Sequence, residues 1–243
     1  WPEFKDIQRS LLLASVLDVE LVTDHSFFAL LTDIARKNKI RYSLSGNNTA
    51  TESFMPESWN WLKSDLRNLK AIQARFGTRP IKTLPTLNFW IRLAYERLGL
   101  ICKPIYLLED CIYRKSEALA LLESEYGFRY YGGKHYESTF TKFYQAYILP
   151  RKFGIDKRRV HLSSLITNGE ITRQQALVEL DTPVYPESEL RKEMSFVLRK
   201  LGFSKEEFEA IMASPPVPHD HYPSDIKIYR ILRWLKLKLW GRG

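Results

Sequence analysis

The chain has 243 residues, of which 44% are hydrophobic, 11 are Gly and 12 are Pro; this allows one large or two small domains with a full core, and excludes disordered and fibrous classes. The formal net charge is +9, which indicates an anionic partner such as nucleotide phosphates, nucleic acid or an acidic membrane surface. Cys102 and Cys111 are too few for a disulfide scaffold or a four-thiolate zinc site, so we expect a reduced, cytoplasmic setting and two buried apolar cysteines.

The first sixty residues combine helix and strand patterns. Apolar residues recur every three to four positions in Phe4–Val16, which predicts an amphipathic helix, and a second helix is expected over Ser26–Lys37 with Asp24 as its N-cap. A short strand is predicted at Ile40–Leu44, and it ends in a loop of small polar residues, 45–52. In α/β proteins, a loop at the carboxyl end of a strand commonly forms a ligand site.

From residue 58 onward the pattern is helical. Helices are predicted over residues 58–76, 86–98, 115–126, 138–150, 157–167, 172–180, 188–201, 204–213 and 225–240. Two helix starts have capping-box spacing: Thr172 with Gln175, and Ser204 with Glu207. Three helix ends are expected at glycines that suit a left-handed backbone: Gly127, Gly169 and Gly202. The prolines of Ser214–Ser224 predict an extended connector that sets the last helix apart from the body.

The strongest local charge lies in the span 132–159, where residues 134–159 carry +5. Basic residues at the start of a helix that Asp156 caps oppose the helix dipole, which indicates a bound anion, so we take Lys157 and Arg158 as phosphate contacts. The aromatic residues of the span have the spacing of a helix core. A solvated helical face is the alternative explanation of the charges.

Several separate motifs occur in one order along the chain. They are Trp1-Pro-Glu-Phe-Lys-Asp-Ile-Gln, Thr23-Asp24-His25, the loop Ser45-Gly46-Asn47-Asn48-Thr49-Ala50-Thr51-Glu52, Gly132-Gly133-Lys134-His135-Tyr136-Glu137-Ser138, and residues 152–164. Together they resemble the N-acetyl sugar amidotransferases over roughly residues 1–182. The resemblance fades after Pro183.

The resemblance implies an α/β fold, with a partial PP-loop (HUP-like) parallel-sheet domain followed by a mostly α-helical C-terminal region. Its domains would be residues 1–60, the C-terminal part of the ATP pyrophosphatase-like domain; 61–213, a helical substrate- and phosphate-binding region; and 214–243, the connector and a basic helix. The implied enzyme uses ATP and Mg²⁺ to convert the N-acetyl group of a nucleotide-linked sugar into an acetamidino group, in O-antigen or flagellin-glycan synthesis. Ammonia would come from separate glutaminase and cyclase-like subunits.

The chain also departs from the family's pattern. Family members carry paired cysteines that resemble a zinc site and a Ser-Gly-Gly-x-Asp-Ser loop that holds the ATP phosphates, both upstream of the motifs seen here. Neither occurs in this chain, which starts at Trp1 rather than Met. We therefore expect a chain that lacks the N-terminal part, with zinc only in that part, and without activity on its own.

The resemblance and the residue chemistry give one set of candidate site residues and no metal ligands. The catalytic candidates are Asp24, His25, Glu52, Lys134, His135 and Glu137, and the nucleotide- or phosphate-binding candidates are Ser45, Gly46, Asn47, Lys142, Lys157 and Arg158. The structural alternatives are an N-cap at Asp24, a polar turn with Glu52 capping the next helix, and a surface salt-bridge cluster around Lys134. His219 and His221 are expected in a solvated loop rather than a metal site.

The terminal helix, within residues 226–243, carries +6 and no acid. This composition is typical of a helix that lies in a membrane surface or docks on a partner, so peripheral attachment at the inner membrane is expected. Two other functions stay open: a different PP-loop enzyme, asparagine-synthetase-like or tRNA-thiolating, and a basic nucleic-acid-binding module. Under the favoured reading, nucleic acid is not a partner.

Overall fold

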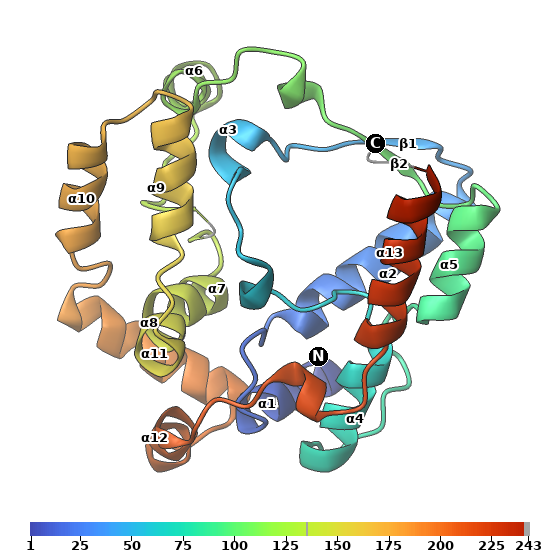
Figure 1. Cartoon of the computed structure of the whole chain (residues 1–243). Coiled ribbons are helices and arrows are strands. Elements are labelled where there is room, and N and C mark those ends of the chain that lie inside the picture. The colour runs from blue at the N-terminus through green and yellow to red at the C-terminus, as the bar shows by residue number, and fades with distance from the viewer. Residues whose placement is uncertain (135, 241–243) are drawn as a thin grey trace. The chain divides into compact units, whose positions relative to one another are not determined.

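The structure is a computed structural model that describes residues 1–134 and 136–240 (Figure 1). The described chain is mostly helical. Its α-helices are α1 (Pro2–Leu13), α2 (Leu21–Lys37), α3 (Thr49–Glu52), α4 (Leu66–Phe76), α5 (Phe89–Arg97), α6 (Lys115–Tyr126), α7 (Thr139–Phe143), α8 (Leu149–Phe153), α9 (Arg158–Thr167), α10 (Arg173–Asp181), α11 (Glu187–Leu201), α12 (Lys205–Ala213) and α13 (Ile226–Trp240). Shorter turns are η1 (Glu57–Trp59), η2 (Leu107–Glu109), the π-helical η3 (Tyr144–Ile148) and η4 (His219–His221).

The sheet consists of β1 (Tyr42–Leu44) and β2 (Lys103–Ile105), which pair in parallel with Ser43 opposite Pro104. The predicted strand at 40–44 is therefore confirmed, but the described residues contain only this pair and not a larger parallel sheet. The sequence pattern missed β2 because it is three residues long and contains a proline, which offers no N–H to a ladder and is tolerated at a sheet edge.

The chain divides into two units, each built from separate segments. Unit 1 comprises residues 1–41, 58–102 and 214–243, and unit 2 comprises 42–57 and 103–213. The expected domains 1–60, 61–213 and 214–243 stay a prediction, and unit 1 contains residues from each of these three ranges. The connector and α13 therefore belong to the same unit as the N-terminal helices.

The core of unit 1 lies between α1 and α4, where Ile7, Leu11, Leu69 and Ile72 are fully buried. Helix α2 begins five residues before the predicted start, because Leu21 and Val22 are also fully buried and extend the packed face. Asp24 consequently lies inside this helix, and its predicted N-cap role is wrong. The predicted helix 58–76 is also shortened to α4, since Asp65 caps its start by accepting the N–H of Asn68.

The connector at Ser214–Ser224 is packed into unit 1, contrary to the expectation that it sets the last helix apart. The N–H of Val217 donates to the oxygen of Ser15, and the Oγ of Ser224 donates to the carboxylate of Asp65. His219 is buried and its ring stacks on Trp61, with 4.9 Å between the ring centroids. Its predicted place in a solvated loop is therefore wrong, because both ring nitrogens meet polar groups inside the unit.

Those polar groups are Asn68 and the backbone of Asp18. The Nδ1 atom of His219 lies 2.8 Å from Oδ1 of Asn68, and Nε2 accepts the N–H of Asp18 at 3.2 Å. Because Nε2 accepts this hydrogen bond, the single ring proton of the neutral imidazole lies on Nδ1. This arrangement joins the connector to α4 and to the loop between α1 and α2.

Unit 2 is organised around the helical stretch α7–η3–α8, where Phe143, Tyr144, Ile148 and Leu149 are buried. The predicted helix 138–150 is confirmed, with a π-helical segment just before Pro150. Proline lacks an N–H and crowds the preceding turn, so a wide turn at this place relieves the clash. Helices α9 and α10 lie side by side in this unit (Figure 1).

The local start and stop signals are confirmed. Both predicted capping boxes form, Thr172 with Gln175 and Ser204 with Glu207, each through two reciprocal hydrogen bonds. Gly127, Gly169 and Gly202 adopt φ values of 65°, 74° and 74°, as a left-handed helix end requires. The cysteines differ from expectation, because Cys111 is exposed and Cys102 only half-buried.

Candidate functional site

Two of the predicted loops come together in unit 2. The ammonium group of Lys134 forms an ion pair with the carboxylate of Glu52, and both side chains are partly shielded from water. Glu52 ends α3, which packs against α9, so the alternative in which Glu52 caps the next helix is wrong. This pair joins the segment 45–52 to the segment 132–138.

The loop 45–52 is held by hydrogen bonds from β2 and η2. The N–H of Ser45 donates to the oxygen of Ile105 and continues the strand pairing. Asn48 caps α3 by accepting the N–H of Thr51, and the carboxylate of Glu109 accepts the N–H and the hydroxyl of Thr49 at 2.6 and 2.8 Å. Gly46 and Asn47 lie exposed at the tip of this ordered loop.

The two glycines before Lys134 have separate structural reasons. Gly132 has a φ of 89°, which a side chain rarely allows. A Cβ atom on Gly133 would fall 2.4 Å from the ring of Tyr136, so only glycine leaves room for this ring. The Gly-Gly turn thus places both Lys134 and Tyr136 at the site, whereas His135 lies outside the described residues.

A cavity of 420 Å³ opens beside this turn, entirely within unit 2. Its described lining includes the basic side chains of Lys115, Lys134, Arg151, Lys157 and Arg158. It also includes four tyrosines, Tyr130, Tyr136, Tyr147 and Tyr185, and the acids Asp156 and Glu179. A positively charged lining with phenol donors suits an anionic ligand that carries a ring.

Arg158 forms one wall of this cavity by binding to the end of α10. Its guanidinium donates to both carboxylate oxygens of Asp156 and to the backbone oxygens of Glu179, Leu180 and Thr182 at 2.7 to 3.1 Å. The hydrogen bonds to Asp156 raise the pKa of Arg158 further. All N–H groups of the Arg158 guanidinium are therefore already engaged. This predicted phosphate contact is thus bound to groups of the protein itself.

Asp156 also accepts the N–H of Arg158 at 2.9 Å, so the predicted cap at the start of α9 is confirmed. Lys157, the other predicted phosphate contact at this helix start, lines the cavity, with its ammonium 6.0 Å from the centre of the Tyr144 ring.

Lys142 belongs to α7 and is not among the described residues that line the cavity; its ammonium group reaches α11. Its Nζ atom is 2.6 Å from Glu189 and 3.1 Å from Glu193, and it lies 4.7 Å from the centre of the Tyr185 ring. Burial alone would lower the pKa of Lys142, but the two carboxylates outweigh burial and raise it. The charge of this predicted phosphate ligand is thus neutralised by two carboxylates. The alternative explanation, a charge on a solvated helical face, does not describe Lys142 either.

Two tyrosines at the cavity are held in their protonated form. Burial raises the pKa of Tyr136 to about 12. Burial and the hydrogen bond from its hydroxyl to Glu193 raise the pKa of Tyr185 as well. Both hydroxyls therefore keep their protons near neutral pH. Glu137 lies beside Tyr131, whose pKa is raised by burial and then by this carboxylate.

The other two catalytic candidates, Asp24 and His25, belong to unit 1. Asp24 pairs with Lys63 at 2.8 Å, and Lys63 also pairs with Asp18 at 2.5 Å. His25 is 2% exposed; its Nδ1 lies 2.9 Å from the oxygen of Lys63, and its Nε2 accepts the N–H of Leu87. Burial lowers the pKa of His25, so the ring is neutral and joins two loops of this unit.

The comparisons with known proteins concern mainly unit 2. Residues 137–236 are similar to the C-terminal domain of WbpG-like LPS biosynthesis proteins. WbpG is a member of the N-acetyl sugar amidotransferase family. The WbpG-like region covers α7 to α12 and most of α13, and it contains Lys142, Lys157 and Arg158. No curated protein and no solved structure matches the chain.

Sequence reasoning missed several side chains of the cavity. Tyr136 follows the Gly-Gly turn, and Tyr185 stands between Pro183 and Pro186 in the link from α10 to α11. An aromatic residue between two prolines is a signal that could have indicated a rigid segment in the wall of a cavity. Within the described residues, no three His, Cys, Asp or Glu side chains form a group able to hold a metal ion, so we assign no residue to Mg²⁺.

Proposed function

We propose that the protein is an ATP-dependent amidotransferase of surface-glycan synthesis, which converts the N-acetyl group of a nucleotide-linked sugar into an acetamidino group. One observation carries this proposal. The WbpG-like region supplies most of the cavity in unit 2, and the same cavity contains Lys134 from one of the family-like motifs.

The cavity has the chemistry that a nucleotide-linked sugar needs. Its volume of 420 Å³ is within the usual range for small-molecule sites, which is about 300 to 1,000 Å³. The diphosphate of such a substrate would interact with Lys157, Arg151 and Lys134, since ammonium and guanidinium groups form strong hydrogen bonds to phosphate. The rings of Tyr130 and Tyr147 offer flat surfaces for the base or the sugar, and the phenols of Tyr136 and Tyr185 can donate to oxygens.

The proposed reaction proceeds in two displacements. The amide oxygen of the N-acetyl group attacks the α-phosphorus of ATP and releases pyrophosphate, which leaves an adenylated imidate. Ammonia then adds to the imidate carbon, loses a proton, and displaces AMP, so that one oxygen of the sugar is replaced by NH. The adenylation is needed because an amide oxygen is a poor leaving group.

Lys134 and Glu52 are the residues that we assign closest to this chemistry. The positive charge of Lys134 stabilises the phosphate charge that develops on the leaving groups. Glu52 holds the ammonium group of Lys134 in place, and we assign its carboxylate to take the proton from ammonia. Mg²⁺ carried by ATP would supply additional positive charge at the phosphates.

The test is an assay of the full-length protein. It is incubated with ATP, ammonium and nucleotide-linked N-acetyl sugars, and mass spectrometry follows the replacement of O by NH together with AMP formation. We expect Lys157→Gln to weaken substrate binding by about 10- to 100-fold, since a hydrogen bond to a charged group contributes about 1.5 to 3 kcal/mol. Lys192→Gln, on the exposed face of α11, is the control and should leave binding unchanged. Absence of both AMP and the amidino product overturns the proposal.

A further inference from the structure

The described side chains on the exposed side of helix α13 are of two kinds, basic and apolar. One side of the helix is formed by Ile226, Ile228, Tyr229 and Leu232, which are buried or half-buried. The exposed side chains that the structure describes on this helix are all basic or apolar: Lys227, Arg230, Ile231, Arg233, Trp234, Leu235, Leu237 and Lys238. A surface that faces only water normally mixes charges of both signs, and this helix has no acid.

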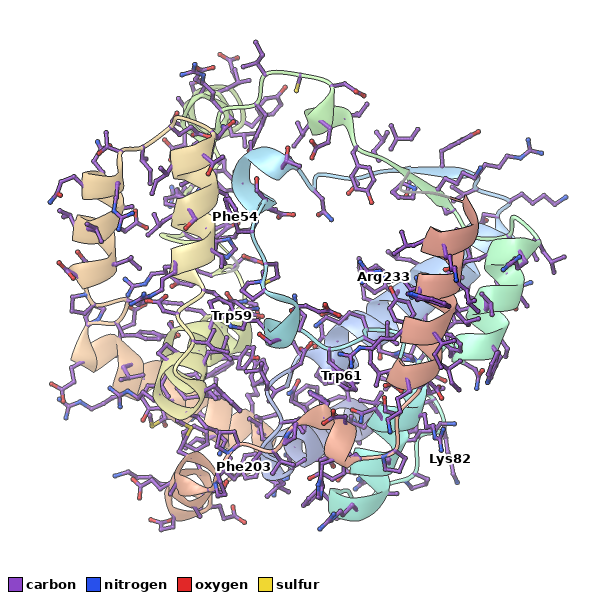
Figure 2. All side chains as sticks on the ribbon, in the orientation of Figure 1. Phe54, Trp59, Trp61, Lys82, Phe203 and Arg233 are labelled. Carbon is purple, nitrogen blue, oxygen red and sulfur yellow. The ribbon has the colours of Figure 1, made fainter. Side chains whose placement is uncertain are left out.

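The apolar residues of this surface lie between the cations. Ile231 and Trp234 are both 58% exposed, and helical spacing places them in the middle of the exposed side. Lys227 and Lys238 lie on the same side, towards the two ends of the helix. Lys238 lies 5.0 Å from the centre of the Trp234 ring, and Arg233 projects from the same helix (Figure 2).

We propose that the exposed side of α13 binds the surface of an anionic lipid bilayer, with the helix parallel to that surface. The ammonium and guanidinium groups would contact lipid phosphates, and their long apolar stems allow the charges to stay at the headgroups. Trp234 suits the headgroup level, and Ile231 and Leu235 would enter the boundary with the acyl chains. This inference goes beyond the proposed reaction and does not depend on the cavity in unit 2.

Charge complementarity and the apolar residues together favour a bilayer over nucleic acid. The phosphates of a nucleic acid would satisfy the cations equally well. They would leave Ile231, Leu235 and Leu237 in water, because a sugar-phosphate backbone offers no apolar layer to cover them. A bilayer surface accommodates both kinds of side chain at once.

The test is co-sedimentation of the whole 243-residue chain with vesicles. We expect binding to vesicles of phosphatidylcholine with phosphatidylglycerol, little binding to phosphatidylcholine alone, and weaker binding at high salt. The double variant Lys227→Gln/Lys238→Gln should reduce the partition of the protein onto these vesicles about 25-fold. Each charge near the lipid surface contributes about 1 kcal/mol, which corresponds to about fivefold. The variant Ile231→Ser/Trp234→Ser should also reduce this partition, and the binding that remains should depend more steeply on salt.

A matched control separates this surface from overall charge. Lys192→Gln/Arg199→Gln removes the same charge from exposed positions of α11 and should leave partition unchanged. Circular dichroism of each variant checks that the helices are retained. Equal loss in the control, no difference between the two kinds of vesicle, or binding to RNA in place of vesicles would each overturn the proposal.

Discussion

The ammonium group of Lys134 forms an ion pair with the carboxylate of Glu52, although the two residues are 82 positions apart in the sequence. The pair connects the Gly-Gly turn at the cavity to α3, whose other end is held by Glu109. The two motif loops are thereby fixed to each other inside one unit. Loss of this link should be measurable both in stability and in binding.

The first prediction concerns the energetic coupling of this pair. Lys134→Met and Glu52→Gln should each lower the free energy of unfolding by about 0.5 to 1 kcal/mol, because both groups are partly exposed and solvent screens their attraction. The double variant should lose less than the sum of the two, since each single change already breaks the pair. Urea unfolding of the four proteins measures the coupling, and strict additivity would contradict the contact.

A second prediction concerns Arg158 as the residue that orders the cavity wall. Arg158→Lys retains the charge but cannot reach Asp156 and three backbone oxygens at once, so we expect a loss of about 2 to 3 kcal/mol in the free energy of unfolding. Hydrogen exchange should accelerate in residues 180–186. Arg159→Lys on the same helix is the control, because Arg159 is exposed. Equal exchange in both variants would show that Arg158 does not hold this wall.

Gly133 provides a third prediction. In Gly133→Ala the new Cβ atom would meet the ring of Tyr136, which must move and change the shape of the cavity. Ligand affinity should therefore fall more than thermal stability. Lys192→Gln is the control, because this side chain is exposed on α11 and lies outside the cavity lining. Titration calorimetry with a nucleotide-linked sugar compares the two, and similar affinities would refute the steric argument.

A fourth prediction follows from His219. Burial lowers its pKa from 6.5 to about 4, so the unfolded chain binds a proton at pH values where the folded chain does not. The stabilisation from the neutral ring is complete above pH 6.5 and is lost as the pH falls towards 4. For a shift of this size the loss is roughly 3 kcal/mol. Urea unfolding across this pH range measures it, and an NMR titration of the ring gives the pKa directly.

Glu3 supplies the control for this pH dependence. Backbone N–H groups of Lys82, Thr83 and Leu84 hold its pKa near 2, with Lys82 contributing most. A lowered carboxylate pKa stabilises the fold above pH 4.5, and this stabilisation disappears as the pH falls below that value. Glu3→Gln should therefore leave the change between pH 6.5 and 4.5 intact. A midpoint near 6.5 for His219 would contradict its buried, hydrogen-bonded place.

Local sequence signals predicted the helices of unit 2 well. The helix Lys115–Tyr126 and the ends at Gly127, Gly169 and Gly202 agree with the pattern, because caps and left-handed turns depend on residues within about four positions. The errors lie where packing overrides such signals. Helix α2 starts early because Leu21 and Val22 join the core, and the three-residue β2 gives too short a pattern to recognise.

The candidate site was predicted only in part. Lys134, Lys157 and Arg158 do line one cavity, and Glu52 is bound to Lys134. Lys142 instead faces Glu189 and Glu193, which stand 47 and 51 positions away. No local pattern shows such partners, because a side chain that could bind a ligand and one that is neutralised by an acid look alike in a sequence.

The sequence by itself therefore determined the helix limits at capping boxes and left-handed glycines, the concentration of positive charge in residues 134–159 and the basic and apolar composition of the last helix. The tertiary structure decided which charged side chains face a cavity and which are neutralised by ion pairs inside the protein. It also decided the state of His25 and His219, which are buried and neutral. The physical reason is range: caps and periodicity act within a few residues, whereas ion pairs, burial and shifted pKa values depend on segments that only folding brings together.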